Sequence, residues 1–506
     1  MTPSQTRITP DSFLTKVGTS KDGEPIIVYF VPGNPGVVSY YHYFLALVAS
    51  NLSSSESAAS SSSFAPAVVA APLACGAAPQ QQEQRARSYE SSTRSCGQSS
   101  TNSSGSSAAS RDGRAGFKSR INSVRRRKSK EVETRERDEE EEKEEEEKVD
   151  EGSLSTKREE ILNYPNTNSE ESYLITGRSL AGFEIEEEGA ASAGLSSCRA
   201  TFSFTDKMHG LAAQVEYVED NLAQFVRKYQ RKVTAAATEA ALAAGQEKDA
   251  VSVRKPRPKV ILLGHSVGAY ISMELLRNRK EREKTRAVKA EDDAGASSDR
   301  GKGDDEEVEM DIIGGLMLFP AVVDIAKSPS GKTMTTLLNI PYLHIIASLV
   351  AKGLMSLFPS PIVRRLIRYV LKGAPDDPVD TTIAFLKSRT GVQQALYLTA
   401  EEMEQIGADK WSDEIWGISE EYKPSDDAKS QLTKLVFYFG RNDHWVAEKT
   451  RDEIIQARAS QGGRGPKMVV CEDGIEHAFC IRHNEIMADK VSGYIREIVN
   501  DYRSRE

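Results

Sequence analysis

The sequence lacks most of the features that mark secreted, metal-binding and nucleic-acid-binding proteins. Five cysteines among 506 residues, without paired spacing, exclude a disulfide scaffold and give no zinc signature. The first residues, MTPSQTRITPDSFL, contain no apolar h-region, so we expect no secretory signal peptide and a cytosolic chain. Acidic residues outnumber basic ones by 75 to 66, and a net charge of −9 argues against nucleic-acid binding by the whole protein.

Apolar residues are also scarce, at 39% of the chain against about 45–50% in typical globular proteins. Two polar tracts, residues 51–170 and 278–309, account for the deficit. The first holds 19 serines in residues 51–110, then a block of net charge +8 (111–130) and a block of net charge −10 (131–160). Tracts of this kind cannot bury a core, so both are predicted to be disordered insertions. The remaining 354 residues suffice for one large domain.

Continuous apolar runs predict the buried strands of a mostly parallel sheet. The runs lie at 24–32, 172–184, 259–266, 311–320, 434–440 and 467–473. Helix-like segments alternate with them, among them 208–228 and a final helix with Met487, Val491, Ile495 and Ile498 on one face. This alternation is typical of an α/β fold with helices on both faces of the sheet. The predicted core segments are 1–50, 171–277, 310–330 and 431–506.

The segment Gly264-His265-Ser266-Val267-Gly268 lies between a predicted strand and a predicted helix. A G-x-S-x-G pattern in this position is typical of the nucleophile elbow of α/β-hydrolases. Small neighbours allow a tight turn that projects the serine hydroxyl, and the amides of the following helix stabilise an oxyanion at the same point. We therefore predict an α/β-hydrolase fold with Ser266 as the nucleophile.

A serine nucleophile needs an oriented base, and this fold places an acid and then a histidine after later strands. Asp443 and His477 each follow one of the last two strand-like runs. The predicted catalytic residues are therefore Ser266, Asp443 and His477, acting by two-step acyl transfer without a metal or organic cofactor. Asp324, which follows the preceding run, is the main alternative acid.

The loop after the first strand, PGNPG (32–36), stands where the fold supplies the second oxyanion donor. Proline has no N–H, so the backbone amides of Asn34 and Val267 are the predicted donors. An ordinary Gly/Pro turn is the alternative interpretation of this loop. His265 occupies the variable elbow position and is predicted to be structural.

A helical lid is predicted between the core segments, at 331–430. Its first part, 333–351, has no charged residue, but Asn339, Pro341 and His344 argue against a stable membrane span. A basic amphipathic helix follows at 361–372. Its apolar side carries Ile362, Val363, Leu366, Ile367, Val370 and Leu371, and its basic side carries Arg364, Arg365, Arg368 and Lys372. We predict that Leu366, Ile367, Val370 and the three arginines lie at a membrane interface; a helix buried in the protein is the alternative.

Six segments together resemble the lipid droplet-associated hydrolase family, a branch of the α/β-hydrolases. They are FVPGNPGVVSYY (30–41), LLGHSVGAY (262–270), LFPAVVDIAKSPSGK (318–332), EEMEQI (401–406), FGRNDHW (439–445) and EHAFCIRH (476–483). They occur in the family's order, and the resemblance carries the triad onto Ser266, Asp443 and His477. The sequence departs from the pattern in its long insertions and in SLAGF (179–183), where a histidine-bearing SHAGH-like loop is expected.

The resemblance implies a serine hydrolase on the cytoplasmic face of lipid droplets or the endoplasmic reticulum, bound peripherally or monotopically. The implied substrates are neutral lipid or sterol esters, and the implied partner is the droplet monolayer or reticulum membrane. Two other functions stay open. One is a droplet protein with weak or vestigial hydrolase activity that acts in droplet organisation, and the other is a soluble acyl esterase or thioesterase.

Overall fold

The computed structural model describes residues 6–18, 24–54, 171–185, 207–243, 256–293, 308–418, 433–459 and 465–505. Of the first predicted insertion, all but residues 51–54 lies outside these ranges, and so do residues 294–307 of the second. The described residues belong to one unit of the chain.

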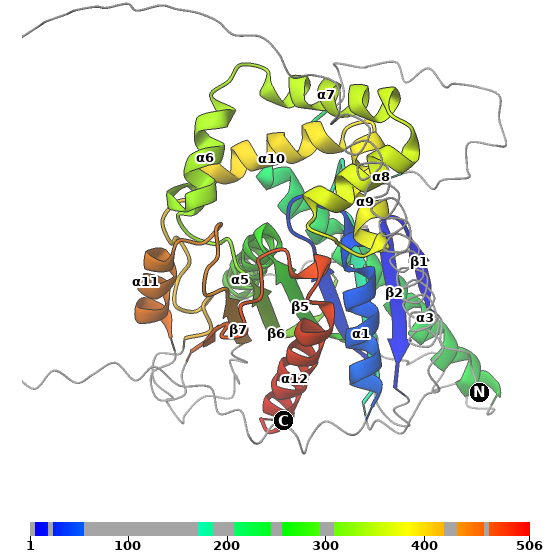
Figure 1. The fold of residues 1–506 in the computed structure, drawn as a ribbon. Helices are drawn as coiled ribbons and strands as arrows, with labels where there is room; N and C mark the ends of the chain where they lie inside the picture. Colours follow the sequence, from blue (N-terminus) through cyan, green and yellow to red (C-terminus); the bar gives the residue numbers. More distant parts are fainter. Residues whose placement is uncertain are drawn as a thin grey trace, which may run out of the picture. The chain divides into compact units, whose positions relative to one another are not determined.

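Within these ranges eight strands form one sheet, whose order is β1-β2-β4-β3-β5-β6-β7-β8 (Figure 1). The strands are β1 (Arg7–Thr9), β2 (Ser12–Val17), β3 (Ile26–Val31), β4 (Tyr173–Arg178), β5 (Lys259–His265), β6 (Asp311–Leu318), β7 (Lys434–Phe439) and β8 (Lys467–Val470). The six strands β3 to β8 run parallel to one another. Strand β2 is antiparallel to both β1 and β4. The predicted α/β-hydrolase fold with a mostly parallel sheet is thus confirmed.

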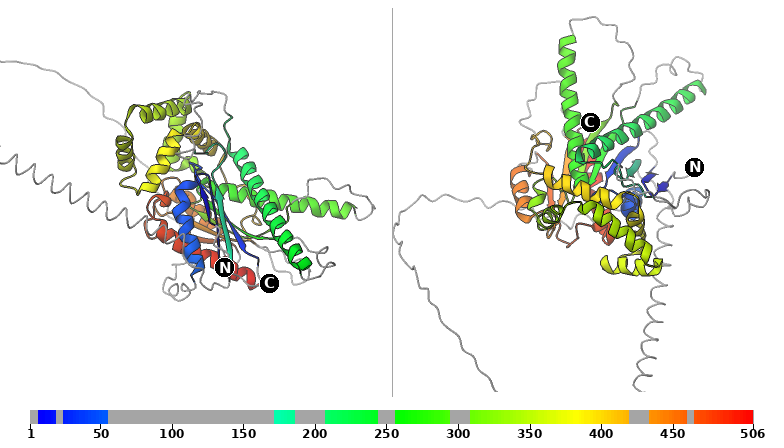
Figure 2. Two further views of the ribbon diagram at one scale, coloured as in Figure 1. Left: turned by 90° about the vertical axis from the view of Figure 1, so that its right-hand side faces the viewer. Right: turned by 90° about the horizontal axis from the view of Figure 1, so that it is seen from above.

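Each face of the sheet buries its own apolar cluster, because neighbouring residues of a strand point to opposite faces. Ile27 and Tyr29 of β3 join one cluster, and Val28 and Phe30 join the other. Helices α3 (Leu211–Ala243), α5 (Val267–Asp293) and α11 (Glu448–Arg458) cover the first face, and α1 (His42–Ser53) and α12 (Asn484–Arg503) cover the second. Figure 2 shows α1 and α12 on one side of the strands and α3 and α5 on the other. Burial on both faces explains why the core strands are continuous apolar runs.

Helix α5 corrects the prediction of a disordered insertion beginning at Asn278. The helix continues to Asp293, so residues 278–293 are helical. Pairs of opposite charge one turn apart, such as Arg277–Glu281 and Arg279–Glu283, support its polar part. Charge density alone wrongly suggested disorder, because it ignored the helical spacing of the charges.

Between β6 and β7, the described residues form five α-helices that gather at one end of the sheet (Figure 1), where a helical lid was predicted. They are α6 (Pro329–Leu338), α7 (Leu343–Leu357), α8 (Ser360–Val370), α9 (Asp376–Lys387) and α10 (Gly391–Gln405). Ser328 caps the first of them by accepting the Gly331 N–H. In the part of the chain that the structure describes, no single helix has the length and hydropathy to cross a membrane. Helices α6 and α7 meet that test only as a pair, bent by 94°.

Candidate active site

The serine lies in a strained turn between β5 and α5. Ser266 has a left-handed backbone with φ of 55°, and its N–H donates to the Leu318 carbonyl of the neighbouring strand. The flanking glycines leave room for this turn. A Cβ atom at Gly268 would lie 2.2 Å from the Val31 carbonyl oxygen, and one at Gly264 would lie 2.5 Å from the Gly268 carbonyl oxygen. The two glycines of the G-x-S-x-G pattern are therefore required by close backbone contact.

Three predicted residues from separate loops meet at this turn. His477 Nε2 lies 3.0 Å from Ser266 Oγ, and His477 Nδ1 lies 2.8 Å and 2.9 Å from the two carboxylate oxygens of Asp443. Because a carboxylate only accepts, Nδ1 carries the hydrogen and Nε2 presents its lone pair to the serine hydroxyl. This arrangement suits a hydroxyl nucleophile, its general base and the acid that orients the base.

Asp443 is buried, and its surroundings favour the charged form. Burial alone would raise its pKa, but the adjacent His477 and the N–H of Trp445, 2.8 Å from Oδ1, hold the pKa below its ordinary value. The alternative acid, Asp324, instead pairs with Lys327 at 2.7 Å. The structure thus brings Asp443, and not Asp324, to the histidine.

Tyr41 and His265 connect the loops that surround the serine. The Gly33 N–H donates to the Tyr41 hydroxyl over 3.3 Å, and this hydroxyl lies 2.8 Å from His265 Nδ1. His265 Nε2 lies 2.9 Å from the His477 carbonyl oxygen, so Nε2 donates and Nδ1 accepts. Burial, followed by the nearby His477, lowers the pKa of His265 to about 3, which keeps the ring neutral. The elbow histidine, predicted to be structural, thus ties the first loop to the histidine loop.

The loop of residues 32–36, called the oxyanion loop below, passes directly against the serine. A Cβ atom at Gly33 would lie 2.9 Å from the Cβ of Ser266. The Gly33 amide is already bonded to Tyr41, and the Asn34 amide next to it is the predicted donor of this loop. Val267 is the first residue of α5, where backbone amides have no partner within the helix. Both predicted donors therefore belong to segments that border Ser266.

The segment SLAGF packs behind the oxyanion loop. The Leu180 N–H donates to the Gly36 carbonyl over 2.8 Å, and a Cβ atom at Gly36 would lie 2.6 Å from the Cβ of Leu180. Leu180 and Phe183 are fully buried. Apolar side chains therefore fill the space where a histidine-bearing loop was expected.

The lid structure corrects part of the predicted membrane interface. Ile367 and Val363 are buried against Ala374 and Val379, so Ile367 cannot contact a surface. Arg364 pairs with Asp376 and Asp380, and Arg368 also pairs with Asp376. Of the predicted interface residues, Leu366, Val370 and Arg365 are exposed. The apolar arc of α8 is wide enough to be divided, with one half facing the lid interior and the other facing outward.

Exposed large apolar side chains also gather on the neighbouring helices α6 and α7. We call all of these exposed apolar side chains the lid surface; its members are Leu337, Ile340, Tyr342, Ile346, Leu349, Val350, Leu354, Leu357, Phe358, Ile362, Leu366, Tyr369 and Val370. Among the described residues, the other exposed large apolar side chains are Leu242, Val288 and Ile486. Concentrations of this kind mark interaction sites.

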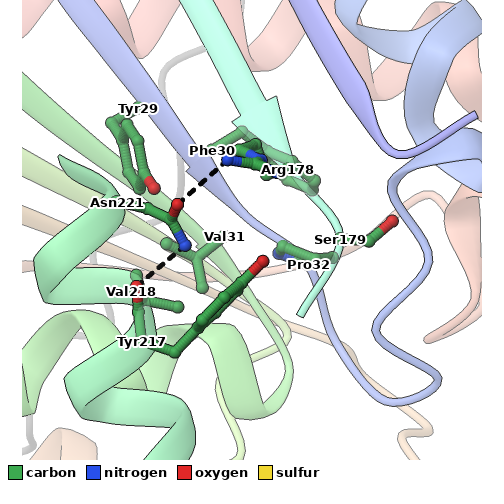
Figure 3. A pocket seen from close by; sticks show the side chains of 9 residues that line it. All are labelled: Tyr29, Phe30, Val31, Pro32, Arg178, Ser179, Tyr217, Val218 and Asn221. Atoms are coloured by element: carbon green, nitrogen blue, oxygen red, sulfur yellow. Dashed lines mark hydrogen bonds between the residues drawn. The ribbon is translucent and has the colours of Figure 1, made fainter. Parts of the chain in front are cut away.

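A small cavity of about 10 Å³ lies between β3, β4 and α3 (Figure 3). Beside it, Arg178 donates to Asn221 over 3.1 Å, and Asn221 donates to the Tyr217 carbonyl over 2.8 Å. Its volume suits about one water molecule, and its lining includes no triad residue. The described residues contain no cluster of three or more His, Cys, Asp or Glu side chains that could hold a metal ion.

Sequence reasoning missed the contacts that support the triad from outside it. From the sequence, Tyr41 stood out only as the last residue of the segment FVPGNPGVVSYY, and Glu402 of α10 only as part of the segment EEMEQI. Glu402 is buried and lies 2.9 Å from the side-chain nitrogen of Asn34. An acidic residue on the otherwise buried face of a helix was the available signal.

Comparisons with known proteins place the chain in a family. The model of the family described as lipid-droplet associated hydrolase matches residues 159–480. The chain is 26% identical over 242 residues to the lipid droplet-associated hydrolase of Gallus gallus, covering 47% of this chain and 59% of that protein. It is 23% identical to the Homo sapiens protein, covering 47% of this chain and 58% of that protein. The matches thus span somewhat more than half of the length of these relatives.

Solved structures of similar proteins include two enzymes. A haloalkane dehalogenase from Bradyrhizobium elkani is 8% identical with a TM-score of 0.39, covering 98% of each chain. A serine hydrolase from Cycloclasticus zankles is 9% identical with a TM-score of 0.37, covering 97% of each chain. The family model accounts for more than half of the residues. The chain belongs to the lipid droplet-associated hydrolase family.

Proposed function

We propose that this protein is a serine hydrolase that cleaves ester bonds of neutral lipids or sterol esters at the surface of lipid droplets. The observation that carries the proposal is the continuous chain of contacts from Ser266 Oγ through His477 to Asp443. Membership of the family, and the strained turn that presents the serine, support it.

The proposed reaction is a two-step acyl transfer. His477 Nε2 takes the proton of Ser266 as Oγ attacks the ester carbonyl, and Asp443 stabilises the imidazolium that forms. The backbone amides of Asn34 and Val267 donate to the developing oxyanion. His477 then gives its proton to the leaving alcohol, and water, activated by the same histidine, hydrolyses the acyl-enzyme.

The lid surface supports the proposal that the substrate is reached at a lipid surface. Its apolar side chains are exposed on three successive helices, and the exposed Arg365 lies on the same helix as Leu366 and Val370. Such a surface suits an acyl-chain boundary with anionic headgroups beside it, on a droplet monolayer or the endoplasmic reticulum.

The test is a panel of emulsified triacylglycerol, cholesteryl ester and short-chain ester substrates, assayed with wild-type protein and Ser266→Ala. We expect fatty acid release from at least one lipid ester by the wild type, stimulated by droplets, and none by the variant. Equal release by both proteins would overturn the proposed chemistry. Release from soluble esters alone would overturn the proposed substrate class.

A further inference from the structure

We infer that Glu402 and Thr399, on the inner face of lid helix α10, are positioning residues that hold the oxyanion loop through the side chain of Asn34. The inference rests on the proposed function, because the backbone amide of Asn34 is a proposed oxyanion donor. It assigns to the lid a part in the chemistry beyond covering the site.

The geometry concentrates three acceptors on one amide group. Asn34 Nδ2 lies 3.0 Å from the Ala395 carbonyl oxygen, 2.9 Å from Thr399 Oγ1 and 2.9 Å from Glu402 Oε1. Positions 395, 399 and 402 share one face of a helix, since they are four and then three residues apart. Two turns of α10 therefore hold one side chain of the oxyanion loop by hydrogen bonds.

The side chains that accept these hydrogen bonds are costly to bury. Glu402 is 5% exposed and Thr399 is also buried. Burial raises the pKa of Glu402 to about 8, against a smaller opposing effect of the Asn34 hydrogen bond, so the protonated form of the carboxyl predominates at neutral pH. A neutral acid still offers a carbonyl oxygen to the Asn34 amide. An apolar side chain of similar size would fit this position without a desolvation cost. The presence of a carboxyl there therefore indicates that its hydrogen bond to Asn34 has a function.

Helix α10 is itself held by contacts other than those with Asn34. Gln394 is fully buried, accepts the His209 N–H over 2.9 Å and donates to the His209 carbonyl over 2.7 Å. Thr390 donates to the Gly182 carbonyl over 3.1 Å, in the segment behind the oxyanion loop. Helix α7, which carries part of the lid surface, also packs against α10. The helix thus connects the lid surface to the loop beside Ser266.

Removing the acceptor at position 402 should release the Asn34 side chain and let the oxyanion loop shift. An oxyanion donor acts mainly in the transition state, so the loss should appear in kcat and not in KM. We expect Glu402→Met to lower kcat on a soluble short-chain ester by about ten- to a hundred-fold. The rate of covalent labelling by a fluorophosphonate should fall in proportion, with KM within about threefold of wild type.

Three further variants separate positioning from packing. Glu402→Gln keeps an acceptor oxygen and the neutral state, so it should restore kcat to within about threefold of wild type. Glu404→Met, a matched change at an exposed position of the same helix, should leave kcat and melting temperature unchanged. Thr399→Val, which removes one acceptor with little change of shape, should lower kcat by about three- to ten-fold.

The outcomes are distinguishable. Wild-type kcat in Glu402→Met, or a loss confined to KM, would overturn the inference while the proposed function stands. A kcat of Glu402→Gln as low as that of Glu402→Met would overturn the inference as well. Should Glu402→Met fail to fold, an unaltered kcat in folded Thr399→Val decides against the inference and a lowered one decides for it. Absence of labelling in the wild-type protein would overturn the proposed function and the inference together.

Discussion

The core and the lid place the same kinds of residue in opposite environments. Ile27, Val28 and Leu262 of the core strands are completely buried, whereas Leu357 and Val370 of the lid are 77% and 67% exposed. In the core, apolar side chains stabilise the sheet that holds the loops of Ser266, Asp443 and His477 in place. In the lid, they form a surface that the protein itself does not cover. The comparison teaches that the chemistry and the proposed lipid contact belong to different regions, joined through α10.

The largest expected effect lies in the core site. Ser266→Ala and His477→Ala should each lower kcat on an ester substrate by about 10⁶-fold, because nucleophile and base act as one unit. The double variant should lose no more than either single one. A double variant whose losses multiply would show that the two residues act independently.

Replacement of the acid should follow in size. Asp443→Asn should lower kcat by about 10⁴-fold, since the amide cannot hold the tautomer with hydrogen on Nδ1. The control is Asp324→Asn, which should leave kcat within about twofold, because Asp324 pairs with Lys327 away from the histidine. Greater damage from the control would transfer the acid role to Asp324.

Glu402, on the inner face of the lid, should make the free energy of unfolding depend on pH. The pKa of Glu402 is about 8 in the folded protein against an ordinary value of 4.5, so between these values the folded state retains a proton that the unfolded state has lost. Its contribution therefore lowers the free energy of unfolding as pH rises through this window, by about 1.4 kcal/mol per pH unit, and levels off above pH 8. Denaturant titrations of wild type and Glu402→Gln should show a flatter pH dependence in the variant. Parallel curves would contradict a neutral buried Glu402.

The outer face of the lid should respond by losing lipid binding and not stability. Replacing Leu357, Leu366 and Val370 with serine removes apolar area worth about 1.5–3 kcal/mol per side chain if fully buried. Even half of that value lowers partitioning onto droplets by more than tenfold in a flotation assay, with an unchanged melting temperature. The matched change Ile367→Ser, one residue from Leu366 but buried, should instead destabilise the fold by about 2–4 kcal/mol. Equal effects of the two variants on stability would remove the distinction between the faces of α8.

The smallest effect should come from the exposed arginine. Arg365→Gln should weaken binding to vesicles containing anionic lipid by about 1 kcal/mol at low salt, and less at physiological salt because the attraction is screened. Arg364→Gln is the control, since Arg364 already pairs with Asp376 and Asp380. A larger loss of vesicle binding in the control would show that these pairs open at the lipid surface.

The sheet and the positions of the triad could be predicted because physical rules tie them to local patterns. A strand buried on both faces is a continuous apolar run, and the elbow requires small residues around Ser266. The hairpin of β1 and β2 was missed, because β1 has only three residues and β2 carries polar residues such as Lys16, so neither is a continuous apolar run. The helix after Asn278 was missed because a dense charge run was taken for disorder without counting its spacing.

The division of the lid could not be predicted from the pattern alone. Ile362 and Val363 are adjacent and equally apolar, yet Ile362 is exposed and Val363 is buried, because the packing of α9 decides which part of the arc is covered. The roles of Tyr41, His265 and Glu402 depend on partners far along the chain. Contacts of that kind leave no local periodicity to read.

The most direct test of the central account is to locate a fluorophosphonate adduct on the intact protein by peptide mass spectrometry at neutral pH. The account predicts one adduct, on Ser266, formed by the wild type and strongly slowed in Asp443→Asn. An adduct on a different serine, or a wild-type protein that forms none, would contradict the claim that the core site is a working serine hydrolase centre.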